Sequence, residues 1–284
     1  MTFIFANVDG RSALVDDVRY FDLETISNGS VNHDPSKALG QPEALHDLAA
    51  QLGSYTESGF LDQVQLRAPV PLPCNSYGIG LNYQTHIDEA EMETPNTPMV
   101  FSKMPSCIVG PNADIMMRSD ECDYEGELVV VIGAGGKDIP VETAWNHVLG
   151  LSVGQDFSDR GAQFMSNPAQ FNLGKSMDTF GPTGPFLVST DSFENPDDLE
   201  LQTWVNNELR QHDRTANLIF DVPTLVAFLS RFTTLRSGDL IFTGTPEGVG
   251  FRNGVFLKDG DIVRTSIEDI GTLTNRCVRS SDYR

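Results

Sequence analysis

The sequence has few basic residues, few cysteines and no long hydrophobic run. It contains 19 lysine and arginine residues against 40 aspartate and glutamate residues, which gives a formal net charge of -21. Such an excess of negative charge argues against nucleic acid and against an anionic membrane surface as a partner. It is typical of a solubilising or salt-adapted surface. An anionic substrate would therefore need a local pocket of basic groups or a metal ion.

The four cysteines lie far apart in the chain and form no CxxC pair. This spacing favours reduced thiols in a cytoplasmic protein over a disulfide framework or a zinc site. No run of 18 apolar residues is present, and the first 15 residues have no basic region followed by a long apolar one. Neither a membrane span nor a secretory signal is therefore expected.

Two acidic residues stand directly before an apolar run in the segment DYEGELVVVIG, residues 123–133. Alternate side chains of a strand share a face, so Glu125 and Glu127 point the same way at the start of a covered strand. Two like charges there are costly without a compensating cation, proton or basic group. Asp156, directly after the apolar segment LGLSVGQ, is a third candidate. Three carboxylates without histidine or cysteine suit Mg²⁺ or Mn²⁺ better than zinc. A solvated strand end is the alternative.

The segment GLNYQTHIDE, residues 80–89, places His86 and Glu89 three positions apart on one face of a short helix. A carboxylate beside an imidazole fixes its tautomer and raises its basicity, as a general base acting on water requires. Exposed helix neighbours are the alternative interpretation. The polar segment that follows, residues 91–98, either orders over a ligand or is a simple connection.

Three later segments contain further polar candidates. If QDFSDRGAQ turns from a strand into a helix, Arg160 and Gln163 lie near the acidic residues and offer a bidentate fork and an amide to a carboxylate. Lys175, between Gly174 and Ser176, could stabilise an oxyanion beside a metal. The glycine-rich loop with Thr245 could hold an anion through backbone N–H groups. Ordinary surface and turn positions are the alternative for each.

The chain of 284 residues predicts a small unit followed by a large one. Residues 1–70 predict a separate α+β unit with a hairpin turn at Asp9 and Gly10 and an amphipathic helix within residues 42–55. Residues 71–284 predict a mainly β domain with some α-helix. The segment IGAGGKD does not complete GxGxxG and no Walker lysine pattern is present, so no nucleotide site is expected.

Three further elements are expected in the large unit. Asn206 and Asn207 indicate the turn of a hairpin. Pro140 is expected to begin a helix. The segment FDVPTLVAFLSRFTTL predicts a helix with an apolar stripe in the core, formed by Leu225, Phe228, Leu229 and Phe232.

Taken together, five segments resemble the fumarylacetoacetate hydrolase family, close to its shorter acylpyruvate and fumarylpyruvate hydrolases. They occur in the family's order, cover residues 75–280, and read GLNYQTHIDE, DYEGELVVVIG, QDFSDRGAQ, GKSMDTFGPTGP and SGDLIFTGTPEGVG. The resemblance implies a mixed β-roll preceded by a variable N-terminal domain, and a homodimer.

The resemblance also implies roles for individual residues. Those implied for binding Mg²⁺ or Mn²⁺ are Glu125, Glu127 and Asp156. Those implied for contact with the substrate are Arg160, Gln163 and Thr245. His86 with Glu89 would activate water on a segment that closes over the site, and Lys175 would stabilise an oxyanion or enolate. Relatives commonly have Asp after the arginine, whereas this chain has Gly161, so the bracing of that arginine is in question.

These roles predict metal-dependent hydrolysis of the C–C bond of a 2,4-dioxo acid to pyruvate and a carboxylic acid. In this hypothesis His86 takes a proton from the water that attacks C4, and Lys175 stabilises the oxyanion before the C3–C4 bond breaks. One alternative uses the same site to decarboxylate oxaloacetate or to isomerise a related acid, because fold similarity cannot select the reaction. The alternative from another class is a non-catalytic small-molecule binding protein.

Overall fold

The structure, a computed structural model, describes residues 2–91 and 93–280. Its largest sheet has 12 strands. The main path of this sheet runs through β4 (Gly59–Phe60), β3 (Arg19–Asp22), β2 (Arg11–Asp16), β1 (Ile4–Val8), β14 (Gly181–Ser189), β12 (Val148–Gln155), β11 (Gly126–Ile132), β17 (Leu240–Phe242), β6 (Ser76–Gly80) and β7 (Met99–Ser102). Off this path lie β5 (Leu66–Arg67), which pairs with β1, and β8 (Ile108–Val109), which pairs with β14.

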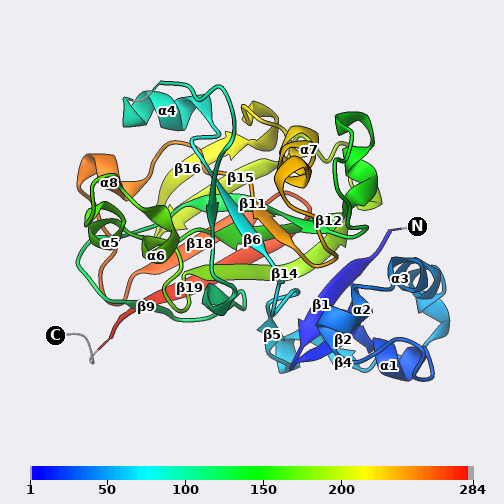
Figure 1. The fold of residues 1–284 in the computed structure, drawn as a ribbon. Helices are drawn as coiled ribbons and strands as arrows, with labels where there is room; N and C mark the ends of the chain where they lie inside the picture. Colours follow the sequence, from blue (N-terminus) through cyan, green and yellow to red (C-terminus); the bar gives the residue numbers. More distant parts are fainter. Residues whose placement is uncertain (1, 92, 281–284) are drawn as a thin grey trace.

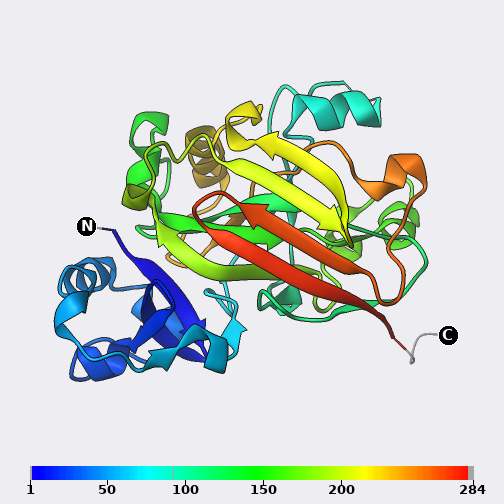
Figure 2. The ribbon, with the colours of Figure 1, turned by 180° about the vertical axis from the view of Figure 1, so that it is seen from behind.

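A second sheet lies across the first, and Figure 2 shows its long hairpins in yellow and red. Its five strands follow in the order β16 (Glu208–Arg214), β15 (Glu200–Val205), β18 (Ile262–Ile267), β19 (Gly271–Arg279) and β9 (Ile115–Met117). A short ladder joins β10 (Cys122–Asp123) to β13 (Ser158–Asp159). The hairpin expected at Asn206 and Asn207 is confirmed, since they connect β15 to β16.

Helices lie around the sheets (Figure 1). The α-helices are α1 (Leu23–Ile26), α2 (Pro35–Ala38), α3 (Pro42–Ala49), α4 (Gln84–Ala90), α5 (Arg160–Phe164), α6 (Phe171–Gly174), α7 (Val222–Phe232) and α8 (Gly250–Asn253). The 3₁₀ segments are Leu52–Ser54, Leu61–Gln63, Pro105–Cys107, Val141–His147, Thr190–Ser192 and Thr215–Asn217. The helix expected at Pro140 is thus a 3₁₀ segment. Within residues 2–91 and 93–280, no helix combines the length and hydrophobicity needed to cross a bilayer.

The strand β11 lies at the centre of the core because both of its faces are covered. Leu128 and Val130 pack with the inner face of the second sheet and with α7, in one hydrophobic cluster. Val129 and Val131 pack on the opposite face with side chains of the N-terminal unit. This explains why the strand reads as a continuous apolar run and not as an alternation. The strand that carries Glu127 and directly follows Glu125 is therefore packed on both faces.

The N-terminal unit forms the hairpin and the helix that the sequence predicts. Asp9 and Gly10 connect β1 to β2 with positive φ angles of 53° and 92°, as a tight hairpin turn requires. β1 also pairs with β14 of the large unit, with Ile4 opposite Val188. The unit therefore extends the main sheet, and a domain boundary at residue 70 stays a prediction.

The apolar stripe of α7 lies in the core only in part. Leu225 and Leu229 are buried, as expected, and Asp221 caps the helix by accepting from the Thr224 N–H at 2.9 Å. Phe232 is 71% exposed, so its expected core position is wrong. It is the last residue of the helix, where no further turn covers it.

Candidate active site

A break in the strand pairing brings the acidic residues together. β11 and β12 are paired as far as Gly126 and Gln155, and the pairing resumes between β10 and β13. Glu125 and Asp156 lie opposite each other in this interruption, where the Asp156 N–H donates to the Glu125 carbonyl at 2.8 Å. Glu127 follows on β11. The three carboxylates therefore gather at the end of the regular ladder.

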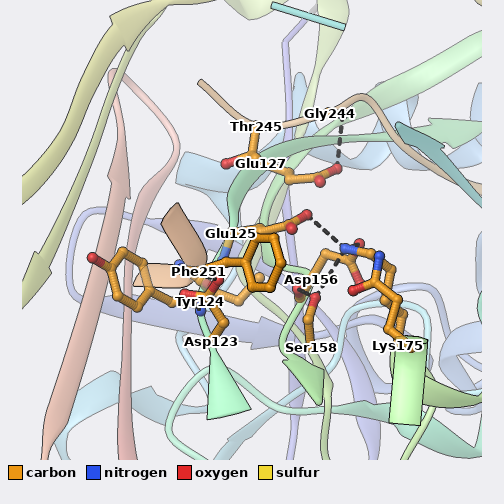
Figure 3. A network of polar contacts seen from close by, with 12 residues as sticks. Asp123, Tyr124, Glu125, Glu127, Asp156, Ser158, Lys175, Gly244, Thr245 and Phe251 are labelled. Carbon is orange, nitrogen blue, oxygen red and sulfur yellow. Dashed lines mark hydrogen bonds and ion pairs between the residues drawn. The ribbon is translucent and has the colours of Figure 1, made fainter. Parts of the chain in front are cut away.

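The three carboxylates converge as the sequence predicts. Oxygens of Glu125, Glu127 and Asp156 all lie within 4.8 Å of one another, and the three residues are 6%, 1% and 0% exposed (Figure 3). This burial excludes the alternative of a solvated strand end. All the donor atoms are carboxylate oxygens, which are the ligands that Mg²⁺ and Mn²⁺ prefer. The residues present therefore fit a hard divalent cation.

Lys175 inserts its ammonium group between two of these acids. Its Nζ atom lies 2.7 Å from Glu125 Oε2, 2.7 Å from Asp156 Oδ2 and 2.9 Å from Ser158 Oγ. The end of α6 delivers this side chain, which is 4% exposed. Lys175 thus lies beside the candidate metal ligands, as its predicted role requires. The two carboxylates that it contacts favour a positive charge at its Nζ atom.

Arg160 is braced by Asp123, whose carboxylate the sequence analysis did not assign. Asp123 Oδ2 accepts from Nε at 2.9 Å and from Nη2 at 2.6 Å, while Glu125 Oε1 accepts from Nη2 at 2.7 Å. Gln163 Oε1 accepts from Nη1 at 2.9 Å. Two of the three predicted substrate contacts, Arg160 and Gln163, therefore lie beside the acids and hold each other in place. The signal for Asp123 is its position two residues before Glu125, on the same face of an extended chain.

The glycine after Arg160 has a local structural reason. A Cβ atom at Gly161 would come within 2.9 Å of Glu121 Oε2. An aspartate here would also place a second negative charge against that carboxylate. Because Asp123 supplies the bracing, the departure from the family pattern does not leave Arg160 without support.

Lys103 is a second buried lysine that sequence reasoning missed. Its side chain is 0% exposed, and its Nζ atom donates to Asp156 Oδ1 at 2.5 Å, to the Phe180 carbonyl at 3.2 Å and to the Lys175 carbonyl. Burial disfavours its charge, but Asp156 outweighs this effect and the pKa of Lys103 is raised. Lys103 therefore holds one carboxylate oxygen of Asp156, while Lys175 holds the other.

A Lys103→Met variant is expected to lose about 3 kcal/mol of unfolding free energy, because removal of one partner leaves the buried Asp156 charge less compensated. Urea denaturation in the presence of a chelator measures this loss. Lys37→Met changes an exposed lysine and should shift the stability by less than about 0.5 kcal/mol. Equal stability of the two variants would contradict the role given to Lys103.

The buried charges of the site do not balance within the described residues. The carboxylates are Asp123, Glu125, Glu127 and Asp156, and the cations are Lys103, Arg160 and Lys175. Among the ion pairs of the described residues, none includes Glu127, whose Oε2 accepts only the Gly244 N–H at 2.8 Å. One negative charge therefore remains for an added cation.

The pKa values of the two glutamates reflect this imbalance. Burial and the negative charges of Asp156 and Glu125 raise the pKa of Glu127 well above its usual range. Burial also disfavours the charge of Glu125, but Lys175 and Arg160 outweigh it and lower the pKa of Glu125 to about 2. Glu127 is therefore the carboxylate that gains most from a divalent cation.

His86 and Glu89 lie together on α4, as their spacing predicts. Nδ1 of His86 is 3.5 Å from Glu89 Oε2, too long for a good hydrogen bond, and the two side chains are 15% and 16% exposed. The Gly248 N–H donates to both oxygens of Glu89, at 3.2 and 3.1 Å, which ties α4 to the loop after β17. His86 lines the same cavity as Glu125. Closure of this segment on binding stays a prediction.

Thr245 lines this cavity, but its hydroxyl group is already engaged. It donates to the Gly126 carbonyl at 2.8 Å and accepts from Gln211 Nε2 at 2.8 Å. Contact between this hydroxyl and a substrate carboxylate stays a prediction, and it would require the first bond to break. The cavity has a volume of about 250 Å³, and its polar lining comprises His86, Glu125, Arg160, Gln163, Lys175, Thr245 and Arg252.

The fold and the site together define a metal-dependent enzyme with a carboxylate cluster in a largely β scaffold. The fumarylacetoacetate (FAA) hydrolase C-terminal family model matches residues 75–278. The chain therefore belongs to the fumarylacetoacetate hydrolase family, and the predicted fold class, mainly β with a small N-terminal domain, is confirmed.

Individual relatives include both isomerising and hydrolysing enzymes. Oxaloacetate tautomerase YisK of Bacillus subtilis (strain 168) is 40% identical over 273 residues, which cover 91% of this chain and 89% of the relative. A crystal structure from Mycobacterium smegmatis is 40% identical with a TM-score of 0.92, and the match covers 99% of this chain and 100% of that one. Maleylpyruvate hydrolase from Sphingobium sp. SYK-6, solved with manganese(II) and pyruvate, is 28% identical with a TM-score of 0.83, covering 98% and 100%. The specific resemblance to acylpyruvate hydrolases is thus not borne out beyond the family.

Proposed function

We propose that the protein interconverts the keto and enol forms of oxaloacetate with Mg²⁺ or Mn²⁺ as cofactor. The convergence of three buried carboxylates, with oxygens within 4.8 Å of one another, is the observation that carries this proposal. Similarity to an oxaloacetate tautomerase over 91% of the chain supports the choice of reaction. This is the isomerase alternative of the sequence analysis, and it replaces C–C hydrolysis as the main hypothesis.

The residues around the carboxylates suit proton transfer next to a carbonyl group. When bound to Glu125, Glu127 and Asp156, the divalent cation supplies a Lewis acid for a 2-oxo acid. His86 then removes or returns the proton at C3, with Glu89 orienting its ring. Lys175 stabilises negative charge on the C2 oxygen.

Hydrolysis of a 2,4-dioxo acid is the second candidate. The pairing of His86 with Glu89 favours it, because such a dyad can equally take a proton from water. Decarboxylation of oxaloacetate is the third, since it needs the same enolate stabilisation without water. Membership of an enzyme family argues against the non-catalytic alternative. A homodimer, a cytoplasmic location and Arg160, Gln163 and Thr245 as substrate contacts stay predictions.

One assay separates these reactions. Oxaloacetate in its enol form is mixed with the manganese-loaded protein, while ultraviolet absorbance follows the enol and a coupled lactate dehydrogenase reaction follows pyruvate. A tautomerase accelerates the loss of enol and releases no extra pyruvate. The same assay is repeated with acetylpyruvate in place of oxaloacetate. Pyruvate released from oxaloacetate would indicate decarboxylation. Pyruvate released from acetylpyruvate but not from oxaloacetate would indicate hydrolysis. Either result would contradict the proposed function.

A further inference from the structure

The cavity that opens from the carboxylates has two aromatic walls. The rings of Phe101 and Phe171 pack edge to face, with centroids 6.0 Å apart and an interplanar angle of 88°. The rings of Phe164 and Phe251 stack at 5.1 Å and 20°. All four line the same cavity as Glu125. A molecule that reaches the acids therefore lies among these rings.

The aromatic walls begin directly at the polar floor of the cavity. The Phe101 centroid lies 5.3 Å from Lys175 Nζ, and the Phe251 centroid lies 5.6 Å from Arg160 Cζ. Phe251 and Glu125, both labelled in Figure 3, line the same cavity. A 2-oxo acid whose carboxylate end occupies the floor must place its third carbon, and any group attached to it, against these rings.

Two glycines of β6 make room for one of these walls. A Cβ atom at Gly78 would lie 2.2 Å from Phe101 Cζ, and one at Gly80 would lie 2.4 Å from Met99 Cε. The side chains of β7 therefore lie flat across the backbone of β6, which side chains at these two positions would prevent. The segment YGIG is thus needed for the wall itself, which makes the apolar lining a built feature of the site.

The second carboxylate of oxaloacetate finds few free cations in this cavity. Arg160 and Lys175 are both engaged with buried acids. Among the described residues, the other permanently charged cation that lines the cavity is Arg252, and it is exposed at the rim. Between floor and rim, the lining is mostly aromatic and aliphatic.

The outer aromatic pair is exposed although it belongs to the cavity. Phe164 is 48% exposed and Phe251 is 39% exposed. Aromatic surface left in contact with water next to a polar site is typical of a ligand-binding position, because a ligand's apolar group covers it. This exposure is a second observation that points to an apolar ligand group.

We propose that the substrates of this site include 2-oxo acids with an aromatic or alkyl group on the third carbon, of which phenylpyruvate is the simplest aromatic case. This proposal rests on the proposed function as a tautomerase. The C3–H bond breaks, its electron pair forms the C2–C3 double bond, and the C2 oxygen takes up a proton. Atoms and electrons balance without an oxidant or a further reactant.

The test measures kcat/KM of the manganese-loaded protein for the tautomerisation of phenylpyruvate and of oxaloacetate. Phe251→Ser and Phe164→Ser change exposed side chains, so folding should be retained. Each is expected to lower the ratio of the phenylpyruvate to the oxaloacetate value by about tenfold. The matched control, Phe232→Ser, changes an exposed phenylalanine of α7 that does not line the cavity, and it should leave the ratio unchanged.

Binding of phenylpyruvate and pyruvate, measured by calorimetry, separates this proposal from the proposed function. Tighter binding of phenylpyruvate that weakens in Phe251→Ser supports the aromatic subsite even if no substrate is turned over, and only the proposed function then fails. Turnover of oxaloacetate with no preferential binding of phenylpyruvate overturns the subsite alone. Equal losses for both substrates in the two serine variants overturn it as well.

Discussion

A Glu127→Gln variant is expected to lose turnover by about 10³-fold or more while its folded state, in the absence of metal, is at least as stable as the original. The amide keeps the shape of the side chain and an oxygen that can accept the Gly244 N–H, but it removes the negative charge. Loss of one carboxylate ligand takes away several kcal/mol of transition-state stabilisation. Without metal, burial and the nearby carboxylates disfavour the charge of Glu127 and raise its pKa, so a neutral amide at this position avoids that cost to folding.

Two measurements on this variant check the expectation together. Steady-state kinetics with added Mn²⁺ measure the turnover, and urea denaturation in a chelating buffer measures the free energy of unfolding. Glu142→Gln changes an exposed glutamate and should alter neither quantity. Retained turnover would show that Glu127 is not a ligand. A clear loss of stability without metal would mean that its charge is already compensated.

A His86→Ala variant is expected to lower turnover by about 10²-fold to 10⁴-fold, the range for removal of a positioned acid or base. Its affinity for Mn²⁺ should stay within about threefold of the original, because the imidazole lies on α4 and is no member of the carboxylate cluster. Glu89→Gln should cause a smaller loss, since it removes only the group that orients the ring. Kinetics and metal titration by calorimetry give the two readouts.

The matched control for this pair is His212→Ala. His212 also faces a carboxylate, with Nε2 2.7 Å from Glu200 Oε1, but it is 52% exposed and does not line the cavity. It should leave turnover unchanged. Unchanged turnover in His86→Ala would remove this residue from the chemistry, whichever reaction is catalysed.

The scaffold of the site could be predicted from the sequence because its signals are local. The apolar run after Glu127 predicts a covered strand, and the two-residue period places Glu125 on the same face. The position of Asp156 directly after a second apolar segment predicts its arrival beside them, which the antiparallel pairing of β11 with β12 confirms. Turn residues, such as Asn206 and Asn207, predict their hairpin for the same local reason.

The remaining features depend on contacts between distant segments. Lys103 stands in a short strand-like segment with no local sign of burial, and only the fold places it 2.5 Å from Asp156. The bracing of Arg160 by Asp123 joins positions 37 residues apart. Phe232 fits the helical spacing of the apolar stripe, but it is the last residue of α7 and its side chain is exposed. The sequence also does not distinguish tautomerisation from hydrolysis, because both reactions can use the same carboxylates, lysine and histidine.

The most direct test of the metal site is a crystal structure of the protein soaked in Mn²⁺, with anomalous scattering used to locate the ion. We expect one strong peak about 2.1 Å from oxygens of Glu125, Glu127 and Asp156, with the Lys175 ammonium moved away from its present position between two of them. A saturating soak that gives no peak among these three carboxylates, or a peak only elsewhere in the molecule, would contradict the assignment of a metal-dependent active site.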